Sequence, residues 1–274
     1  MNAELPSCET LLLSQRQECL TIVLNRPALR NAMNNRMSDE LQAVTEYLAG
    51  NQQIRALVLR GAEHNFCAGG DIKERRAQVE EKTGDQDPVY ERNVRAGQLF
   101  KKIAELPQTT IAFVEGAAMG GGFGFACLMD ITLVAASAKM GMPETTLGVA
   151  PAQIAPYVVR RIGLSKARHM ALTGGRISGE EAYQLGVAHY LFQTPEEGEQ
   201  QLARLLEQIA TCGPRACAVT KEIMNAAAGG LDDSLIEFAA ERFCELNRGG
   251  EGREGQAAFV EKRKARWFSM SGEE

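Results

Sequence analysis

Two glycine-rich segments and one glutamate are the residues of this sequence best suited to chemistry. The segments are FCAGGDIK at residues 66–73 and VEGAAMGGG at residues 114–122, and the glutamate is Glu144 in Met142-Pro143-Glu144. In each segment a strand is expected to end where a helix begins, so backbone amides at the helix start point into the crevice beyond the strand. Two such amides would bind the oxygen of a polarised carbonyl group. A nearby glutamate could transfer protons, and burial beside an apolar ligand would raise its pKa toward neutrality.

Each of these features also has a simpler explanation. A single glycine-rich loop more often only forms a tight turn, and an isolated glutamate is usually a solvated surface residue. His64, His169 and His189 lack metal-ligand spacing, and a lone histidine is more often structural or exposed than catalytic. Cys67 has no histidine near it in the sequence, so we interpret it as a small packing residue.

The elements that must position these residues are predicted from hydrophobic patterning. Short apolar runs predict strands at residues 19–24, 56–59, 110–114 and 131–135. Residues 38–48 predict a helix with Ser38 as its N-cap, and its buried face would carry Leu41, Val44, Thr45 and Leu48. Strands that alternate with helices favour an α/β fold with parallel pairing.

Two further regions differ in character from this alternating pattern. Residues 75–95 are charged and poor in apolar side chains, which predicts a surface excursion or a lid. From residue 195 onward the pattern is helical, with one face made of Leu202, Leu205, Leu206 and Ile209. We therefore expect a core at residues 1–195, which holds the ligand site, and a C-terminal helical region at residues 196–274.

Composition excludes several classes of protein. The chain has 274 residues, of which 45% are hydrophobic and 24% charged, as in a globular protein. A formal net charge of -5 argues against nucleic acid as the main partner. The seven cysteines form no CxxC pair, which predicts neither a disulfide framework nor a zinc site. Without a signal-like N-terminus or a long apolar stretch, we expect a cytoplasmic protein with no membrane partner.

Taken together, the segments resemble the enoyl-CoA hydratase/isomerase (crotonase) superfamily. The resemblance extends over nearly the whole chain, from Asn25-Arg26-Pro27 through AGGD at 68–71 and GGG at 120–122 to FVEKR at 259–263. Each piece is weakly specific alone, but the combination is highly specific. It implies a crotonase-like spiral of β-β-α turns, an acyl-CoA thioester as substrate and a homotrimer or dimer of trimers. It implies no covalently bound cofactor, because coenzyme A enters as part of the substrate.

The resemblance also assigns roles to individual residues. The amides of Gly70 and Gly121 would form an oxyanion hole, and Glu144 would transfer protons. Residues implied to bind the acyl chain or coenzyme A are Ala28, Arg30, Ala68, Gly69, Asp71, Ile72, Gly124, Phe243 and Lys262. The last two would act from the C-terminal helices, often across a subunit contact, and no residue is implied to bind a metal.

The sequence departs from the two-glutamate hydratases of this superfamily at Gly124, where those enzymes carry an acid. Only the later acid, Glu144, is present, so one carboxyl group must serve as both acid and base or be helped by another group. The missing side chain is expected to free volume for a substrate branched at C3.

Together with APAQIAP at residues 150–156, this departure resembles bacterial hydratases of two branched substrates. These are isohexenylglutaconyl-CoA, from acyclic terpene catabolism, and 3-methylglutaconyl-CoA, from leucine catabolism. Both carry a distal carboxylate, which would need a cation, and Arg92 and Arg95 are candidates.

The leading hypothesis is therefore a lyase that adds water to a branched enoyl-CoA. An isomerase, a decarboxylase or a thioesterase could use the same oxyanion hole. A non-catalytic CoA-binding protein is a further alternative, and the missing acid at Gly124 is its best argument.

Overall fold

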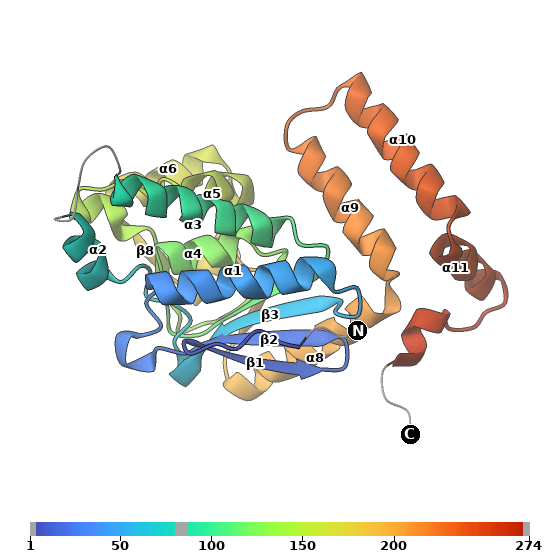
Figure 1. Ribbon diagram of the computed structural model, residues 1–274, viewed down its shortest axis with the longest axis horizontal. Helices are drawn as coiled ribbons and strands as arrows, with labels where there is room; N and C mark the ends of the chain where they lie inside the picture. Colours follow the sequence, from blue (N-terminus) through green and yellow to red (C-terminus); the bar gives the residue numbers. More distant parts are fainter. Residues whose placement is uncertain (1–3, 80–86, 271–274) are drawn as a thin grey trace.

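The computed structural model describes residues 4–79 and 87–270, and in this part of the chain the strands form two sheets (Figure 1). The larger sheet has six strands in the order β1-β2-β3-β4-β6-β9. They are β1 (Leu11–Arg16), β2 (Cys19–Leu24), β3 (Ala56–Gly61), β4 (Thr109–Val114), β6 (Ile131–Ala135) and β9 (Tyr190–Phe192). Only β1 pairs antiparallel, with β2, and all other neighbours in this sheet are parallel. The prediction of an α/β fold with parallel pairing is confirmed.

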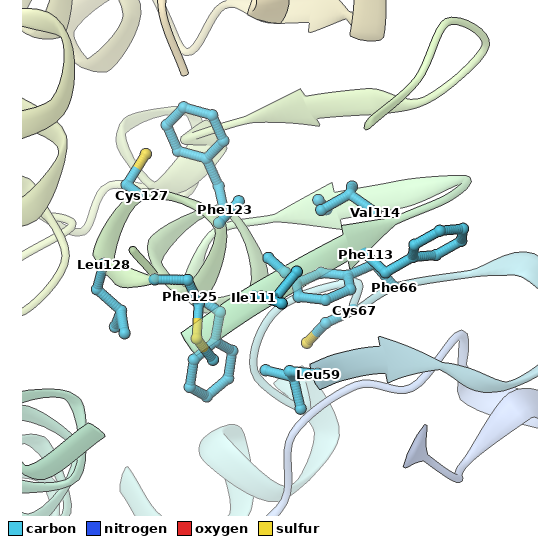
Figure 2. Close-up of a cluster of buried hydrophobic side chains, with 14 of the residues drawn as sticks. Leu59, Phe66, Cys67, Ile111, Phe113, Val114, Phe123, Phe125, Cys127 and Leu128 are labelled. Carbon is cyan, nitrogen blue, oxygen red and sulfur yellow. The ribbon is translucent and has the colours of Figure 1, made fainter. Parts of the chain in front are cut away.

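The second sheet is small and carries the chain toward the glycine triplet. Its strands are β5 (Ala117–Met119), β7 (Lys139–Gly141) and β8 (Arg176–Ser178). Helix α4 (Gly121–Leu128) follows β5 directly, and seven of its eight residues are buried. Figure 2 shows four of its side chains, Phe123, Phe125, Cys127 and Leu128, in one buried cluster with side chains of β3 and β4. A helix that is apolar on all sides is stable only inside the molecule. Burial of α4 therefore holds its first residue, Gly121, in place.

Helix α1 (Asn35–Gly50) packs against β1 and against α3 (Pro88–Ala104). Its predicted buried face is confirmed, since Leu41, Val44, Thr45 and Leu48 are all buried. The predicted N-cap was wrong. The side chain of Asn34 caps the helix by accepting a hydrogen bond from the amide of Met37 at 3.0 Å. Ser38 lies inside the first turn, where its hydroxyl donates to the carbonyl of Asn34.

The described parts of the charged region at residues 75–95 are helical. Helix α2 (Ile72–Val79) enters the region, and α3 begins at Pro88, where the side chain of Asp87 accepts from the amides of Val89 and Tyr90. Residues 80–86 of the predicted lid lie outside the described residues. Leu99, Phe100 and Ile103 anchor α3 in the core. The buried residues of α3 therefore lie after residue 95, beyond the charged region.

Several short elements complete the body of the molecule. The 3-10 helices are η1 (Pro27–Leu29), η2 (Ala62–His64), η3 (Pro143–Leu147) and η4 (Arg266–Met270). The remaining helices of the body are α5 (Ala155–Ile162), α6 (Leu164–Thr173), α7 (Gly179–Leu185) and α8 (Pro195–Thr211). Of the predicted face of α8, Leu202 and Leu205 are buried in the same core as the sheet.

The C-terminal helices α9 (Pro214–Ala227), α10 (Asp233–Arg248) and α11 (Gly250–Val260) project away from the sheet (Figure 1). Arg55, which directly precedes β3, contacts the chain on both sides of these three helices. Its guanidinium pairs with Glu18 at 3.0 Å and donates to the carbonyls of Ile209 and Cys212 at the end of α8. It also donates to the carbonyl of Trp267, so both ends of the projecting segment are tied to one buried cation.

Candidate active site

Backbone hydrogen bonds join the two glycine-rich segments. The amide of Cys67 donates to the carbonyl of Ala117 at 2.8 Å, and the amide of Met119 donates back to the carbonyl of Cys67 at 2.9 Å. On the other side, the amide of Met33 donates to the carbonyl of Gly69 at 2.7 Å. The loop that contains Gly70 is therefore held between Met33 and strand β5, and β5 leads directly into α4.

The amides of Gly70 and Gly121 are suited to bind an oxygen atom. Gly121 is the first residue of α4, and Gly120 is its N-cap with φ 53°. Within residues 4–79 and 87–270, neither Gly70 nor Gly121 donates its amide to another group. An amide at a helix start carries partial positive charge from the helix dipole as well as its own hydrogen atom. The predicted oxyanion-hole glycines are thus placed on adjacent loops with their donors available.

Close packing between the two glycine-rich segments explains why residues 69 and 120 are glycines. Gly69 has φ +95°, and a methyl carbon on it would lie 2.9 Å from the carbonyl oxygen of Met119. A methyl carbon on Gly120 would lie 2.7 Å from Oε1 of Glu144 and 3.9 Å from the Cα of Gly69. The carboxyl group of Glu144 therefore lies against the turn that presents the Gly121 amide.

Strand register places Glu144 at this turn. Strands β5 and β7 are parallel with Met119 opposite Gly141, and the amide of Gly120 donates to the carbonyl of Gly141 at 2.9 Å. The chain then enters η3, whose second residue is Glu144. The hydroxyl of Thr145 donates to the carbonyl of Ala171 at 2.7 Å, which fixes η3 to α6. Glu144 is half-buried, and its Oε2 is buried, so it is not the solvated surface acid of the simpler explanation.

The space beside Gly124 is filled, contrary to the expectation from the sequence. A methyl carbon on Gly124 would lie only 2.4 Å from Cγ2 of Ile154 and 3.8 Å from Phe100. Ile154 is 4% exposed, so its side chain occupies the volume that a larger residue at position 124 would need. The prediction that Gly124 frees room for a branch at C3 was wrong, because a residue distant in the sequence packs onto it.

Apolar side chains complete the surroundings of Gly121. A methyl carbon on Gly121 would lie 3.0 Å from Cε of Met33 and 3.9 Å from Phe100. Phe100 also meets Phe125 edge-on, with ring centroids 5.1 Å apart. Sequence reasoning missed Met33 and Phe100, which are ordinary apolar residues of their own elements and carry no local signal. It used Ile154 only as part of APAQIAP at residues 150–156 and did not predict its contact with Gly124.

The residues implied to bind coenzyme A fall into two groups. Ala28 and Arg30 lie in and just after η1, and the amide of Ala68 donates to the carbonyl of Arg30 at 2.9 Å. Ile72 begins α2 and is 62% exposed. The first group is thus brought together around the Gly70 loop. Phe243, which is 64% exposed, lies on α10, and Lys262 follows α11. Figure 1 shows these helices on the opposite side of the molecule from α2, so one chain does not bring the second group to the glycine loops.

Asp71 is engaged by protein groups. Its carboxylate pairs with Arg26 at 3.0 Å and accepts from the amides of Lys73 and Glu74 at the start of α2. Burial alone would raise the pKa of Asp71, but the hydrogen bonds and charge of Arg26 and the two amides together lower it. In this structure Asp71 therefore joins η1 and α2, which positions the Gly70 loop between them.

Met33, Phe100 and Ile154 form an apolar wall beside Gly121 and Gly124. The two candidate cations for a distal carboxylate face away from this wall. Arg95 pairs with Asp39 of α1. Arg92, three residues earlier, lies on the same face of α3. The opposite face of α3 carries Gly97, which contacts the side chain of Gln153 beside Ile154. The structure thus places these arginines against α1 rather than beside Ile154.

Comparisons with known proteins agree with this geometry. The family model described as "Enoyl-CoA hydratase/isomerase" matches residues 14–270. The chain belongs to the enoyl-CoA hydratase/isomerase family. A human relative, enoyl-CoA hydratase domain-containing protein 2, mitochondrial, is 35% identical over 88% of this chain and 82% of its own length. A probable enoyl-CoA hydratase of Rhizobium meliloti is 33% identical over 94% of this chain and 98% of its own.

Solved structures of this family superpose closely on the chain. Pseudomonas aeruginosa AtuE has a TM-score of 0.91 and 46% identity over 95% of this chain and 100% of its own. An enoyl-CoA hydratase/isomerase from Marinobacter aquaeolei has a TM-score of 0.92 and 44% identity, over the same shares of the two chains. The predicted crotonase-like fold with C-terminal helices is therefore confirmed.

Among residues 4–79 and 87–270, no helix is both long enough and apolar enough to cross a bilayer. In the same part of the chain, no three His, Cys, Asp or Glu side chains are grouped so that they could hold a metal ion.

Proposed function

We propose that the protein is a hydratase that adds water across the α,β double bond of an enoyl-CoA. The observation that carries this proposal is the position of Glu144, whose carboxyl group lies against Gly120 beside the available amide of Gly121. A proton-transfer group next to an oxyanion hole is what enolate chemistry on a thioester requires.

In the proposed reaction, the thioester oxygen accepts hydrogen bonds from the amides of Gly70 and Gly121. Glu144 removes a proton from a water molecule as the water oxygen attacks C3 of the acyl chain. The electron pair of the double bond moves to C2 and the thioester oxygen, which gives an enolate held by the two amides. The protonated Glu144 then delivers its proton to C2, so one molecule of water is added and the carboxylate is restored. A single carboxyl group thus serves as base and then as acid.

The finer choice of substrate rests on the resemblance at residues 150–156. We propose a branched enoyl-CoA, with isohexenylglutaconyl-CoA favoured over 3-methylglutaconyl-CoA. The apolar wall of Met33, Phe100 and Ile154 supports an acyl chain with substantial apolar surface. No cofactor is needed beyond the coenzyme A of the substrate.

We also propose a homotrimer or a dimer of trimers. Large apolar side chains on and beside the C-terminal helices are exposed in the single chain: Met224, Leu231, Ile236, Phe243, Phe259 and Val260. Apolar surface gathered on a projecting segment is typical of a contact between subunits. Such a contact would also allow Phe243 and Lys262 to reach the coenzyme A of a neighbouring subunit. A cytoplasmic location remains our prediction, although the human relative is named as mitochondrial.

The first test is a direct assay with crotonyl-CoA, 3-methylglutaconyl-CoA and isohexenylglutaconyl-CoA. Loss of the conjugated thioester absorbance is followed, and products are identified by mass. We expect a water adduct, formed fastest from a glutaconyl substrate. Glu144→Gln should lower kcat by about 100-fold or more, whereas Glu180→Gln, at an exposed position on α7, should leave it unchanged. Full turnover by a folded Glu144→Gln variant would refute the proposed role.

Isomerisation of the double bond is the second candidate, and one observation favours it. A single carboxyl group beside an oxyanion hole is enough to move a proton between two carbon atoms, without a second group to position water. A product of unchanged mass with a shifted double bond would establish the isomerase. Loss of carbon dioxide or of free coenzyme A would instead indicate decarboxylation or thioester hydrolysis, and binding without turnover a non-catalytic protein.

A further inference from the structure

Two side-chain amides, Asn93 on α3 and Gln153 just before α5, meet at the outer end of the wall beside Gly124. Nε2 of Gln153 donates to Oδ1 of Asn93 at 2.6 Å. Gly97 on α3 leaves room for this contact, because a methyl carbon there would lie 2.2 Å from Oε1 of Gln153 and would push that side chain away. Asn93 is exposed and Gln153 is half-buried, so the pair lies where the wall meets the surface.

The chain geometry places this pair beyond the apolar wall. Ile154, the neighbour of Gln153, packs onto Gly124, which lies one helical turn after Gly121 on α4. Likewise, Gly97 lies about one turn before Phe100 on α3, and Phe100 approaches both Gly121 and Gly124. Each turn advances by about 5 Å. An acyl chain that starts at the Gly121 amide and passes Phe100 and Ile154 would thus reach the amide pair with its far end.

The hydrogen-bonding state of the pair determines what it could recognise. Oε1 of Gln153 is turned against Gly97, and Oδ1 of Asn93 already accepts from Gln153. Within the described part of the chain, the Nδ2 group of Asn93 donates to no other group. The second hydrogen on Nε2 of Gln153 likewise has no acceptor there. The pair therefore offers two donors, the Nδ2 group of Asn93 and the second hydrogen on Nε2 of Gln153, while Oε1 of Gln153 is turned toward the backbone of α3 at Gly97.

We propose that Asn93 and Gln153 determine specificity by donating hydrogen bonds to a carboxylate at the far end of the acyl chain. This inference rests on the proposed function in one respect, since it places the thioester oxygen at Gly121. A carboxylate accepts several hydrogen bonds and needs no single cation when neutral amides surround it. The amide pair thus takes the role that sequence reasoning gave to Arg92 and Arg95.

Binding of two saturated thioesters tests the proposal without any need for turnover. Glutaryl-CoA ends in a carboxylate, and 5-methylhexanoyl-CoA has the same shape with two methyl groups in place of the two oxygens. Isothermal titration should show that the wild-type protein prefers glutaryl-CoA. Gln153→Leu and Asn93→Leu should each reduce this preference by about tenfold, the effect of one lost hydrogen bond to a charged group. Gln153→Glu should reduce it further, because it brings a like charge to the carboxylate.

Gln98→Leu is the matched control, since Gln98 is an exposed amide on the same helix and does not face Gln153. It should leave the preference unchanged. Equal affinity of the wild-type protein for both thioesters would overturn the proposal, and so would variants that weaken both ligands equally. Failure of the proposed hydratase is a separate result, because it would appear as no water adduct while the binding preference is retained.

Discussion

A methyl group added at Gly124 is the most direct test of how the wall beside the candidate oxyanion hole is built. Its carbon would lie 2.4 Å from Cγ2 of Ile154, whereas two carbon atoms attract best at about 3.5–4.0 Å. Ile154 is 4% exposed and cannot move into solvent. Overpacking of this kind costs about 1–3 kcal/mol. Alanine in place of glycine in a helix stabilises it by about 0.5–1 kcal/mol, so Gly124→Ala should lower the free energy of unfolding by up to about 2.5 kcal/mol.

The sign of this effect should depend on residue 154. In the Ile154→Ala background the Cγ2 atom is gone, and Gly124→Ala should become neutral or stabilising by up to about 0.5 kcal/mol. Ile154→Val is the matched control, because valine keeps the Cγ2 atom and removes only the terminal methyl group. In that background Gly124→Ala should remain destabilising.

Equilibrium urea unfolding at one fixed protein concentration measures all six proteins of these two cycles. A destabilisation by Gly124→Ala that is the same in the isoleucine, valine and alanine backgrounds would refute the packing argument. It would show that position 124 is constrained by the backbone of α4 and not by Ile154. The result also decides whether a larger acid at position 124 requires a second change at position 154.

Three further outcomes follow from the contacts described above. Asp71→Asn should cost about 1–3 kcal/mol at neutral pH. The folded-state pKa of Asp71 is lowered, so the stability difference between wild type and variant should be fully present above about pH 4. It should vanish as the pH falls through that lowered pKa. Urea unfolding at a series of pH values measures it. Arg55→Met should lower the free energy of unfolding by about 3–5 kcal/mol, since it leaves Glu18 without its buried partner. Limited proteolysis should then release the C-terminal helices. An unchanged digestion pattern would show that Arg55 does not hold these helices to the rest of the chain. Phe259→Asp, at a position 85% exposed in the single chain, should reduce the mass measured by light scattering to that of smaller assemblies, and an unchanged mass would exclude this residue from the subunit contact.

Local patterning predicted much of the framework. The strands at residues 19–24 and 131–135 were predicted with the bounds that the structure shows, because each is a short apolar run that ends in turn residues or a helix. The buried face of α1 was correct, since helical periodicity alone selects it. Its first residue was wrong, because both Asn34 and Ser38 can cap a helix and only the hydrogen bond to Met37 distinguishes them.

The sequence by itself determined which residues form the candidate chemical centre of this protein. Gly70, Gly121 and Glu144 stand in short motifs that are weak alone, and the resemblance of the whole set to the family singled them out. Their mutual position depends on the register of β5 and β7, which joins Gly120 to Gly141 and brings Glu144 to the turn. A sequence pattern specifies the strands but not which strands pair.

Only the tertiary structure decided what surrounds that centre. The volume at Gly124 is a property of the space between α4 and Ile154, and nothing in either segment alone reports it. The faces of α3 show the same limit, since its arginines turn toward α1 while Asn93 and Gly97 meet Gln153. Chemistry is carried by residue type and is therefore visible in the sequence. Shape is set by neighbours that only folding brings together.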